Sequence, residues 1–242
     1  MSLDIQGSIP APIQKQLKKE AVFGCAICGC PLLNYIHIIP PFDKNAFLPE
    51  NMAAICPNCK SRFDRHEFSE SYLRDVKKNP HNRMREKDAF SLESGDMVIN
   101  LGKMKYINTP RVLAVNDFDI ITLKQENERK LILLDINFFD KLNNLVAIVS
   151  ENSWVAEKQA STSVWEINYK PKHLVIRNNQ NELLFEARIE YQEVFIRGVM
   201  YYSGSTVKVT DNGIWVDERE IASDLNGCVL KNYDIAINAQ TF

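Results

Sequence analysis

The chain has 242 residues and a mass of 27.8 kDa, which is long enough for one large domain or two small ones. Its 45% hydrophobic and 25% charged residues are typical of a globular protein and exclude an intrinsically disordered chain. The net charge of -2 argues against a protein that coats nucleic acid non-specifically. No stretch approaches ~18 consecutive apolar residues and the polar N-terminal segment lacks the apolar core of a signal peptide, so we expect a cytoplasmic protein that does not bind membranes.

The charges are distributed unevenly along the chain. Residues 1–90 contain 13 basic and 10 acidic side chains, whereas residues 91–242 contain 16 and 21. The basic excess is greatest between Lys60 and Lys87, where nine basic side chains accompany five acidic ones. The N-terminal part is therefore suited to approach nucleic-acid phosphates, and the C-terminal part has no general affinity for them.

Five of the six cysteines fall between residues 25 and 59, and four of them form two CxxC pairs. The pairs are Cys25 with Cys28 and Cys56 with Cys59. Each pair can place two thiolates on one tight turn about 2.3 Å from a tetrahedral zinc ion, so the spacing predicts a structural Zn²⁺ site. Disulfides are not expected in a reducing cytosol, and a redox CxxC would be a single pair at the start of a helix in a βαβ unit. Buried free thiols are the remaining alternative, and we expect this of the unpaired Cys30 and Cys228, as small core residues.

The segments around the second cysteine pair contain clear strand and helix signals. Residues 34–39 are predicted to form a short strand that includes His37. A basic helix is expected over residues 60–68. A second helix is expected to begin at the N-cap Ser69 and to end near Lys78.

In this order, the runs CAICG, YIHIIP, PENMAAICPNCK and SRFD resemble an HNH endonuclease domain of the four-cysteine kind. The resemblance covers about residues 10–80. Its most specific parts are HIIP, the Asn five positions before the second CxxC, and CPNC followed by a basic helix. It implies a ββα-metal fold, also described as a treble clef, with the four cysteines as structural zinc ligands.

The resemblance also implies roles for the residues between the two cysteine pairs. His37 matches the general base that activates water, and Asn51 matches the residue that braces the loop carrying this base. In such enzymes a separate divalent ion, Mg²⁺ or Mn²⁺, lies beside the His and polarises the scissile phosphate of DNA. The chain is thus expected to bind DNA, or RNA, and to cut phosphodiester bonds.

The sequence departs from the HNH pattern at the ligands of the catalytic ion. The residue before the base is usually Asp or His, but here it is Ile36, which cannot coordinate a metal. The residue after the second CxxC is usually His or Asn, but here it is Lys60, whose charge would repel a dication. Asp64 falls near a further ligand position, so one oxygen ligand remains, whereas His66 is off register. We therefore expect an eroded catalytic-metal site and weak or lost activity.

The basic helix offers candidate contacts to nucleic acid. Arg62 and Arg65 lie on the helix that packs against DNA in the resembling family, and Lys60 could pair directly with a phosphate. The alternative is that these charges are a solvated helix face. The second hypothesis for function is accordingly a non-catalytic, zinc-stabilised protein-interaction module in which His37 is a framework residue.

The C-terminal part has a different pattern. Residues 1–80 are interpreted as the zinc domain, residues 81–96 as a polar linker and residues 97–242 as a β-rich domain, which makes the chain α+β. Residues 131–142 are ambiguous between strand and helix. Short strands are predicted at 164–169, 173–177, 182–190, 193–202, 206–210 and 213–217.

The regular spacing of these strands favours an antiparallel sandwich or barrel-like sheet, with a short β-solenoid as the alternative. We find no catalytic motif here and interpret Trp154, Trp165 and Trp215 as core aromatics. The acidic, strand-rich composition indicates self-association into a homo-oligomer, or binding of a protein partner. The layout is similar to that of bacterial HNH proteins with a β-rich tail of unknown role.

Overall fold

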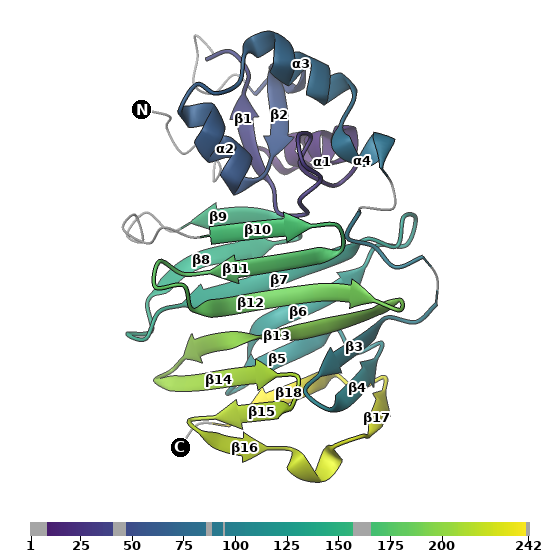
Figure 1. The fold of residues 1–242 in the computed structure, drawn as a ribbon, viewed down its shortest axis with the longest axis vertical. Helices are drawn as coiled ribbons and strands as arrows, with labels where there is room; N and C mark the ends of the chain where they lie inside the picture. The colour runs from purple at the N-terminus through teal and green to yellow at the C-terminus, as the bar shows by residue number, and fades with distance from the viewer. Residues whose placement is uncertain (1–8, 41–46, 86–88, 94, 157–165, 241–242) are drawn as a thin grey trace. The chain divides into compact units, whose positions relative to one another are not determined.

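The computed structural model describes residues 9–40, 47–85, 89–93, 95–156 and 166–240. The chain divides into two compact units, of which residues 1–89 with 152–155 form the first and the remainder forms the second. All α-helices of the described ranges lie in the first unit, and most strands lie in the second (Figure 1). The fold is therefore α+β and rich in β-structure. No described helix combines the length and the apolar character needed to cross a membrane.

The first unit is built on a small antiparallel sheet. Its elements are α1 (Ala11–Glu20), β1 (Asn34–His37), the 3-10 turn η2 (Pro49–Asn51), β2 (Met52–Ile55), α2 (Pro57–Asp64), α3 (Glu70–Lys78) and α4 (His81–Met84). β1 pairs with β2 so that His37 lies opposite Met52. α1 and α3 pack against β2, and α2 packs against β1. The core of this unit includes the fully buried Leu17, Met52 and Leu73.

Local capping explains where the helices of this unit begin and end. The Cys56 side chain caps α2 by accepting a hydrogen bond from the Cys59 amide at 3.4 Å. The Ser69 hydroxyl caps α3 by accepting from the Tyr72 amide at 3.2 Å, and lysines in the last turn complement the helix dipole. The predicted helix from Ser69 to about Lys78 is confirmed.

The second unit contains two sheets. Its strands are β3 (Val98–Leu101), β4 (Met104–Ile107), β5 (Arg111–Val115), β6 (Phe118–Gln125), β7 (Ile132–Phe139), β8 (Leu145–Ser150), β10 (Glu166–Lys170), β11 (His173–Arg177), β12 (Leu183–Glu190), β13 (Glu193–Tyr202), β14 (Ser205–Thr210), β15 (Gly213–Val216), β16 (Arg219–Ile221), β17 (Val229–Lys231) and β18 (Ile235–Ala239). One sheet has the order β18-β5-β6-β7-β8 and continues into β9 (Ser153–Ala156). The other runs from β10 to β16 in sequence order, with β3 beside β13, β4 beside β3 and β17 beside β4.

The two sheets of the second unit lie face to face, with β10–β14 in front of β5–β8 in Figure 1. Between them Phe118 of β6 stacks on Tyr202 of β13, with ring centroids 4.6 Å apart. Strand alternation produces this arrangement, because residues at every second position of β7 and β13 are buried while their neighbours are partly exposed. The predicted sandwich architecture fits these sheets.

Most predicted strands of this unit coincide with observed ones. The segment 131–142, ambiguous in sequence, contains strand β7. The barrel-like expectation is not met, because the described strands form open sheets, and the successive antiparallel hairpins differ from the parallel coils of a solenoid.

The aromatic and cysteine predictions are confirmed in part. Trp154 and Cys30 are buried, as predicted. Cys228 is half-buried, in the turn before β17, and Trp215 is half-exposed on β15, so the prediction that both are core residues is wrong. Trp165 lies outside the described residues.

Candidate metal centre and its surroundings

The four cysteines of the CxxC pairs come together in the first unit. The Sγ atoms of Cys25, Cys28, Cys56 and Cys59 all lie within 4.8 Å of one another. Cys28 Sγ is 3.7 Å from Cys56 Sγ and 3.9 Å from Cys59 Sγ. A tetrahedron with metal–sulfur bonds of about 2.3 Å has edges of about 3.8 Å. The sulfur spacing therefore fits four thiolates around one ion such as zinc.

Each cysteine pair sits on a tight turn whose backbone is itself hydrogen-bonded. In the first turn, the Gly29 amide donates to the Cys25 carbonyl at 2.8 Å, and Gly29 adopts a left-handed φ of 77°. In the second, the Lys60 amide donates to the Cys56 carbonyl at 2.8 Å as α2 begins. These turns aim both sulfurs of a pair to one side, which pre-organises the metal site.

Helix α4 covers the first cysteine turn. The His81 amide donates to the Ala26 carbonyl at 3.0 Å, and the side chain of Asn82, only 1% exposed, donates to the Val22 carbonyl at 3.2 Å. A Cβ atom on Gly29 would lie 2.6 Å from Asn82 Oδ1. Residues 81–84 lie in the segment interpreted from sequence as linker. The sequence did contain one signal that another element approaches this turn, namely the two glycines, Gly24 and Gly29, that flank the first cysteine pair.

The ionisation of the cysteines is consistent with a metal-binding role. Burial raises the pKa of the Cys25 thiol well above its usual range, whereas hydrogen bonds, first of all with Cys25, lower the pKa of Cys28. Neighbouring buried thiolates repel one another, so the cluster cannot ionise fully by itself. A divalent cation at its centre would compensate this charge and release the remaining protons.

His37 and Asn51 lie at the open end of the two-stranded sheet. His37 ends β1, is half-exposed, and stacks on Phe47 with ring centroids 6.1 Å apart. Asn51 Oδ1 accepts from the Ile39 amide at 3.1 Å, and Asn51 Nδ2 donates to the Ile39 carbonyl at 2.7 Å. The Ile38 amide also donates to the Asn51 carbonyl at 2.7 Å. The Asn51 side chain thus holds the chain two residues beyond His37.

The residues predicted to replace the catalytic-metal ligands occupy distinct environments. Ile36 is 4% exposed and belongs to the core of β1. Lys60 and Asp64 lie one turn apart on α2 and form an ion pair of 2.9 Å. Among the described residues, the four cysteines are the only group of three or more His, Cys, Asp or Glu close enough to hold a metal ion.

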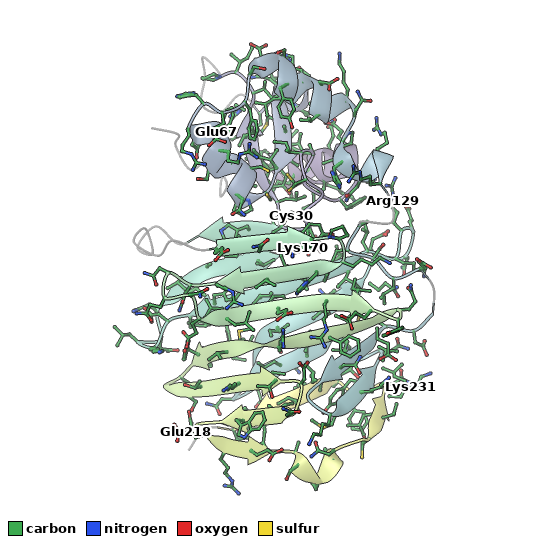
Figure 2. All side chains as sticks on the ribbon, viewed as in Figure 1. Cys30, Glu67, Arg129, Lys170, Glu218 and Lys231 are labelled. Carbon is green, nitrogen blue, oxygen red and sulfur yellow. The ribbon has the colours of Figure 1, made fainter. Side chains whose placement is uncertain are left out.

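The two arginines of the basic helix are also ion-paired. Arg62 Nε lies 2.7 Å from one carboxylate oxygen of Glu67, and Arg65 Nη2 lies 2.7 Å from the other. Glu67 is labelled in Figure 2. Hydrogen bonds from Arg62 and then from Arg65 lower the pKa of the Glu67 carboxyl. The Arg62 guanidinium also lies 4.7 Å from the centroid of the Phe68 ring. The basic face of α2 is therefore partly neutralised by Asp64 on the helix and by Glu67 just after it.

The geometry defines a β-rich α+β protein with a four-cysteine site suited to zinc. Comparisons with protein-family models, with curated proteins and with solved structures give no match to this chain.

Proposed function

We propose that the first unit is a zinc-stabilised nucleic-acid-binding domain of the HNH type, with His37 at the position where phosphodiester bonds are cut. The observation that carries this proposal is the support around His37. His37 is half-buried at the end of β1, and Asn51 braces the following chain through two hydrogen bonds to Ile39. The order strand, strand and helix, with one cysteine pair before β1 and the other at the start of α2, also supports a ββα-metal fold.

In this proposal the four-cysteine metal is structural. Four thiolates complete the tetrahedral shell of zinc and leave no position for a water molecule or a phosphate oxygen. The role of the metal ion is to hold the turn before β1 and the start of α2 together, so that the small sheet keeps its shape. The chemistry then falls to His37.

His37 would act as a general base. Its imidazole takes a proton from water while the water oxygen bonds to phosphorus, the bond from phosphorus to the leaving oxygen breaks, and that oxygen is protonated by solvent. A Mg²⁺ or Mn²⁺ ion would polarise the phosphate, but Asp64 is the one carboxylate proposed for it and is engaged by Lys60 at 2.9 Å. We therefore expect slow turnover.

Nucleic-acid binding would use the cations of α2. Lys60, Arg62 and Arg65 are paired within the helix region, but Arg62 and Arg65 side chains are 49% and 60% exposed. Exposed ion pairs contribute only about 0–1 kcal/mol, so exchanging a carboxylate for a phosphate costs little. Affinity should be modest and should fall with salt.

A second candidate function, a non-catalytic protein-interaction module, has its own support. The Lys60–Asp64 ion pair removes the best remaining ligand for a catalytic ion. In addition, Ile39, two residues after His37, is 40% exposed, and Leu48, which follows the Phe47 that stacks on His37, is 53% exposed. Such residues are typical of contacts with another protein.

Nicking of supercoiled plasmid DNA in Mg²⁺ or Mn²⁺ distinguishes these functions. We expect slow nicking by the wild type and a loss of about 100-fold or more in His37→Ala, because the proton acceptor is removed. His66→Ala is the matched control, since His66 is an exposed histidine two residues after α2, and this variant should retain full activity. If neither protein nicks or binds DNA with either metal, the interaction module is favoured.

A second variant tests the explanation for slow turnover. Lys60→Asn removes the cation beside Asp64 and adds a neutral oxygen ligand, so nicking by this variant should rise and become more dependent on Mn²⁺. An unchanged rate and an unchanged dependence on Mn²⁺ would contradict the eroded-site explanation.

For the second unit we propose self-association through a sheet edge. β10 and β16 end the sequential run of strands in the larger sheet, and each pairs with one other strand among the residues that the structure describes. An unpaired edge can add a strand from a second copy. Sedimentation at micromolar concentration should give more than the monomer mass, and a purely monomeric mass would contradict this proposal.

A further inference from the structure

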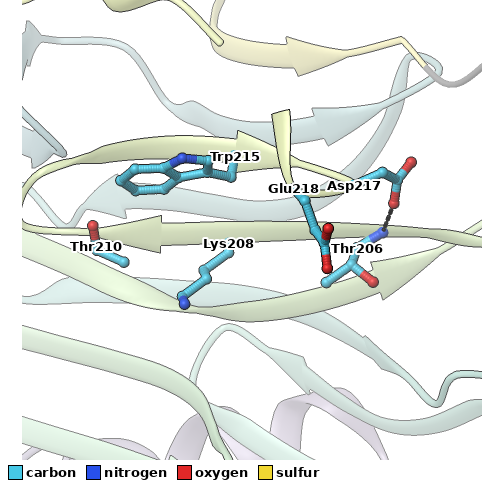
Figure 3. A pocket seen from close by; sticks show the side chains of 6 residues that line it. All are labelled: Thr206, Lys208, Thr210, Trp215, Asp217 and Glu218. Atoms are coloured by element: carbon cyan, nitrogen blue, oxygen red, sulfur yellow. Dashed lines mark hydrogen bonds between the residues drawn. The ribbon is translucent and has the colours of Figure 1, made fainter. Parts of the chain in front are cut away.

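The outer face of the larger sheet carries a hollow around Trp215. Its volume is about 690 Å³, within the range of small-ligand sites, and it is lined by Thr206, Lys208, Thr210, Trp215, Asp217 and Glu218 (Figure 3). Strand alternation places these residues together. On β14 the buried positions are Ser205, Val207 and Val209, so the lining residues of this strand point outward.

Trp215 is a large aromatic residue on a face that is otherwise polar. It lies opposite Lys208 in the pairing of β14 with β15 and is half-exposed. The indole ring packs against Gly213, since a Cβ atom on Gly213 would lie 3.1 Å from Trp215 Cη2. The missing side chain of Gly213 thus leaves room for the indole, which is held on the sheet surface rather than free in solvent.

The polar lining residues divide into fixed and available groups. Asp217 is fixed, because its carboxylate accepts hydrogen bonds from the Thr206 amide and the Ser205 hydroxyl, both at 2.8 Å. Lys208 and Glu218, by contrast, form no ion pair within the part of the chain that the structure describes. Figure 3 shows Lys208 across from the indole, with Thr210 on the same side of the hollow, whereas Glu218 lies on the other side beside Asp217 and Thr206.

We propose that this hollow is a carbohydrate-binding site. The indole offers an apolar surface that can stack on the C–H face of a pyranose ring, and Lys208 and Glu218 offer a donor and an acceptor for hydroxyl groups. One lysine against two carboxylates gives the lining a formal charge of -1, which disfavours a polyanion such as nucleic acid and suits a neutral sugar. The site lies in the second unit and does not rest on the nuclease proposal.

The test uses the full chain, labelled with ¹⁵N, and five neutral probes: cellohexaose, maltohexaose, xylohexaose, mannohexaose and hexa-N-acetylchitohexaose. At least one should bind with a Kd of about 10–1000 μM and should shift the indole N–H signal of Trp215. Trp215→Ala should weaken this binding about tenfold or more, Trp215→Tyr should largely retain it, and Lys208→Ala should weaken it about threefold. Tyr191→Ala is the control, because Tyr191 is a 93% exposed aromatic residue outside the hollow.

Several results would overturn the assignment. One is that no hexaose binds at concentrations up to about 10 mM. Another is that binding is equal in Trp215→Ala. A third is that a thymidine hexanucleotide binds through Trp215 while the sugars do not. If Trp215→Ala does not fold, the wild-type indole shift and the Lys208→Ala and Glu218→Ala variants decide the question, and the absence of both a shift and a variant effect would refute the site.

Discussion

Gly29 shows how a single residue shapes the metal centre. It lies directly after the first CxxC pair, its φ of 77° is in the left-handed region, and its amide closes the turn onto the Cys25 carbonyl. Asn82 and His81 pack so closely over it that a Cβ atom would lie 2.6 Å from a side-chain atom of each. Glycine is therefore needed both for backbone conformation and for space.

Replacing Gly29 should destabilise the cysteine site by more than the cost of a left-handed backbone conformation alone, because the added Cβ atom would also overlap with α4. Gly29→Ala should lower the free energy of unfolding of the first unit by about 2–4 kcal/mol and reduce zinc retention, because strain and steric overlap add. Gly204→Ala is the matched control: its φ is 80°, but nothing lies within 4 Å of the added Cβ. It should cost only about 1 kcal/mol, as measured by urea denaturation. Equal effects of the two substitutions would contradict the packing role of α4.

At this scale the sequence predicted the cysteine cluster well and its surroundings poorly. The two CxxC pairs are close in sequence and chemically distinctive, so the cluster of Cys25, Cys28, Cys56 and Cys59 could be predicted. The cover by Asn82 depends on a contact between residues more than fifty positions apart, for which no local pattern exists. The partial exposure of Trp215 was missed for a different reason: the composition of a strand does not reveal which of its faces is outward.

Among the elements, β12 carries an unusual buried carboxylate. Glu186 is 3% exposed although it faces away from the sandwich core, because Arg197 of β13 and His173 of β11 cover it. Its oxygens lie 2.7 Å from His173 Nε2 and 2.5 Å from Arg197 Nε. Burial alone would raise the pKa of Glu186, but the hydrogen bonds from Arg197 and His173 hold it below its usual range.

This carboxylate should make the second unit sensitive to acid. Because the pKa of Glu186 is lower in the folded state, its carboxylate stabilises the fold at pH values above the unfolded-state pKa of about 4.5. This stabilisation is lost as the pH falls through the folded-state pKa. Glu186→Gln should therefore cost about 2–3 kcal/mol near neutral pH and should flatten the acid dependence below pH 4.5. Urea denaturation across this range measures both effects.

Glu190→Gln provides the control for this prediction. Glu190 lies on the same strand, but its side chain is 51% exposed and its ion pair with Arg188 is 3.3 Å. This substitution should change stability and its acid dependence little. An identical acid dependence in wild type and Glu186→Gln would contradict the role given to the buried carboxylate.

The element scale is where sequence reasoning was most successful. The strands β11 to β15 were predicted to within a residue or two, because alternating β-branched and aromatic residues are separated by short polar turns. The pairing of β3 with β13 could not be predicted, since it is parallel and joins segments almost a hundred residues apart. The number and closure of the sheets depend on such distant pairings.

At the scale of the whole molecule, the uneven charge distribution matches the division into two units. The first unit contains the whole basic segment from Lys60 to Lys87, whereas the second unit consists mainly of the acidic C-terminal sequence. The cysteine cluster lies wholly in the first unit. A small core such as that of the first unit is typical of domains that need a metal for stability.

We propose above all that one zinc ion joins both CxxC pairs. X-ray absorption at the zinc edge of freshly purified protein tests it most directly. We predict one zinc per chain with four sulfur neighbours at about 2.3 Å. A first shell that contains nitrogen or oxygen ligands, or far less than one zinc per chain, would contradict the account.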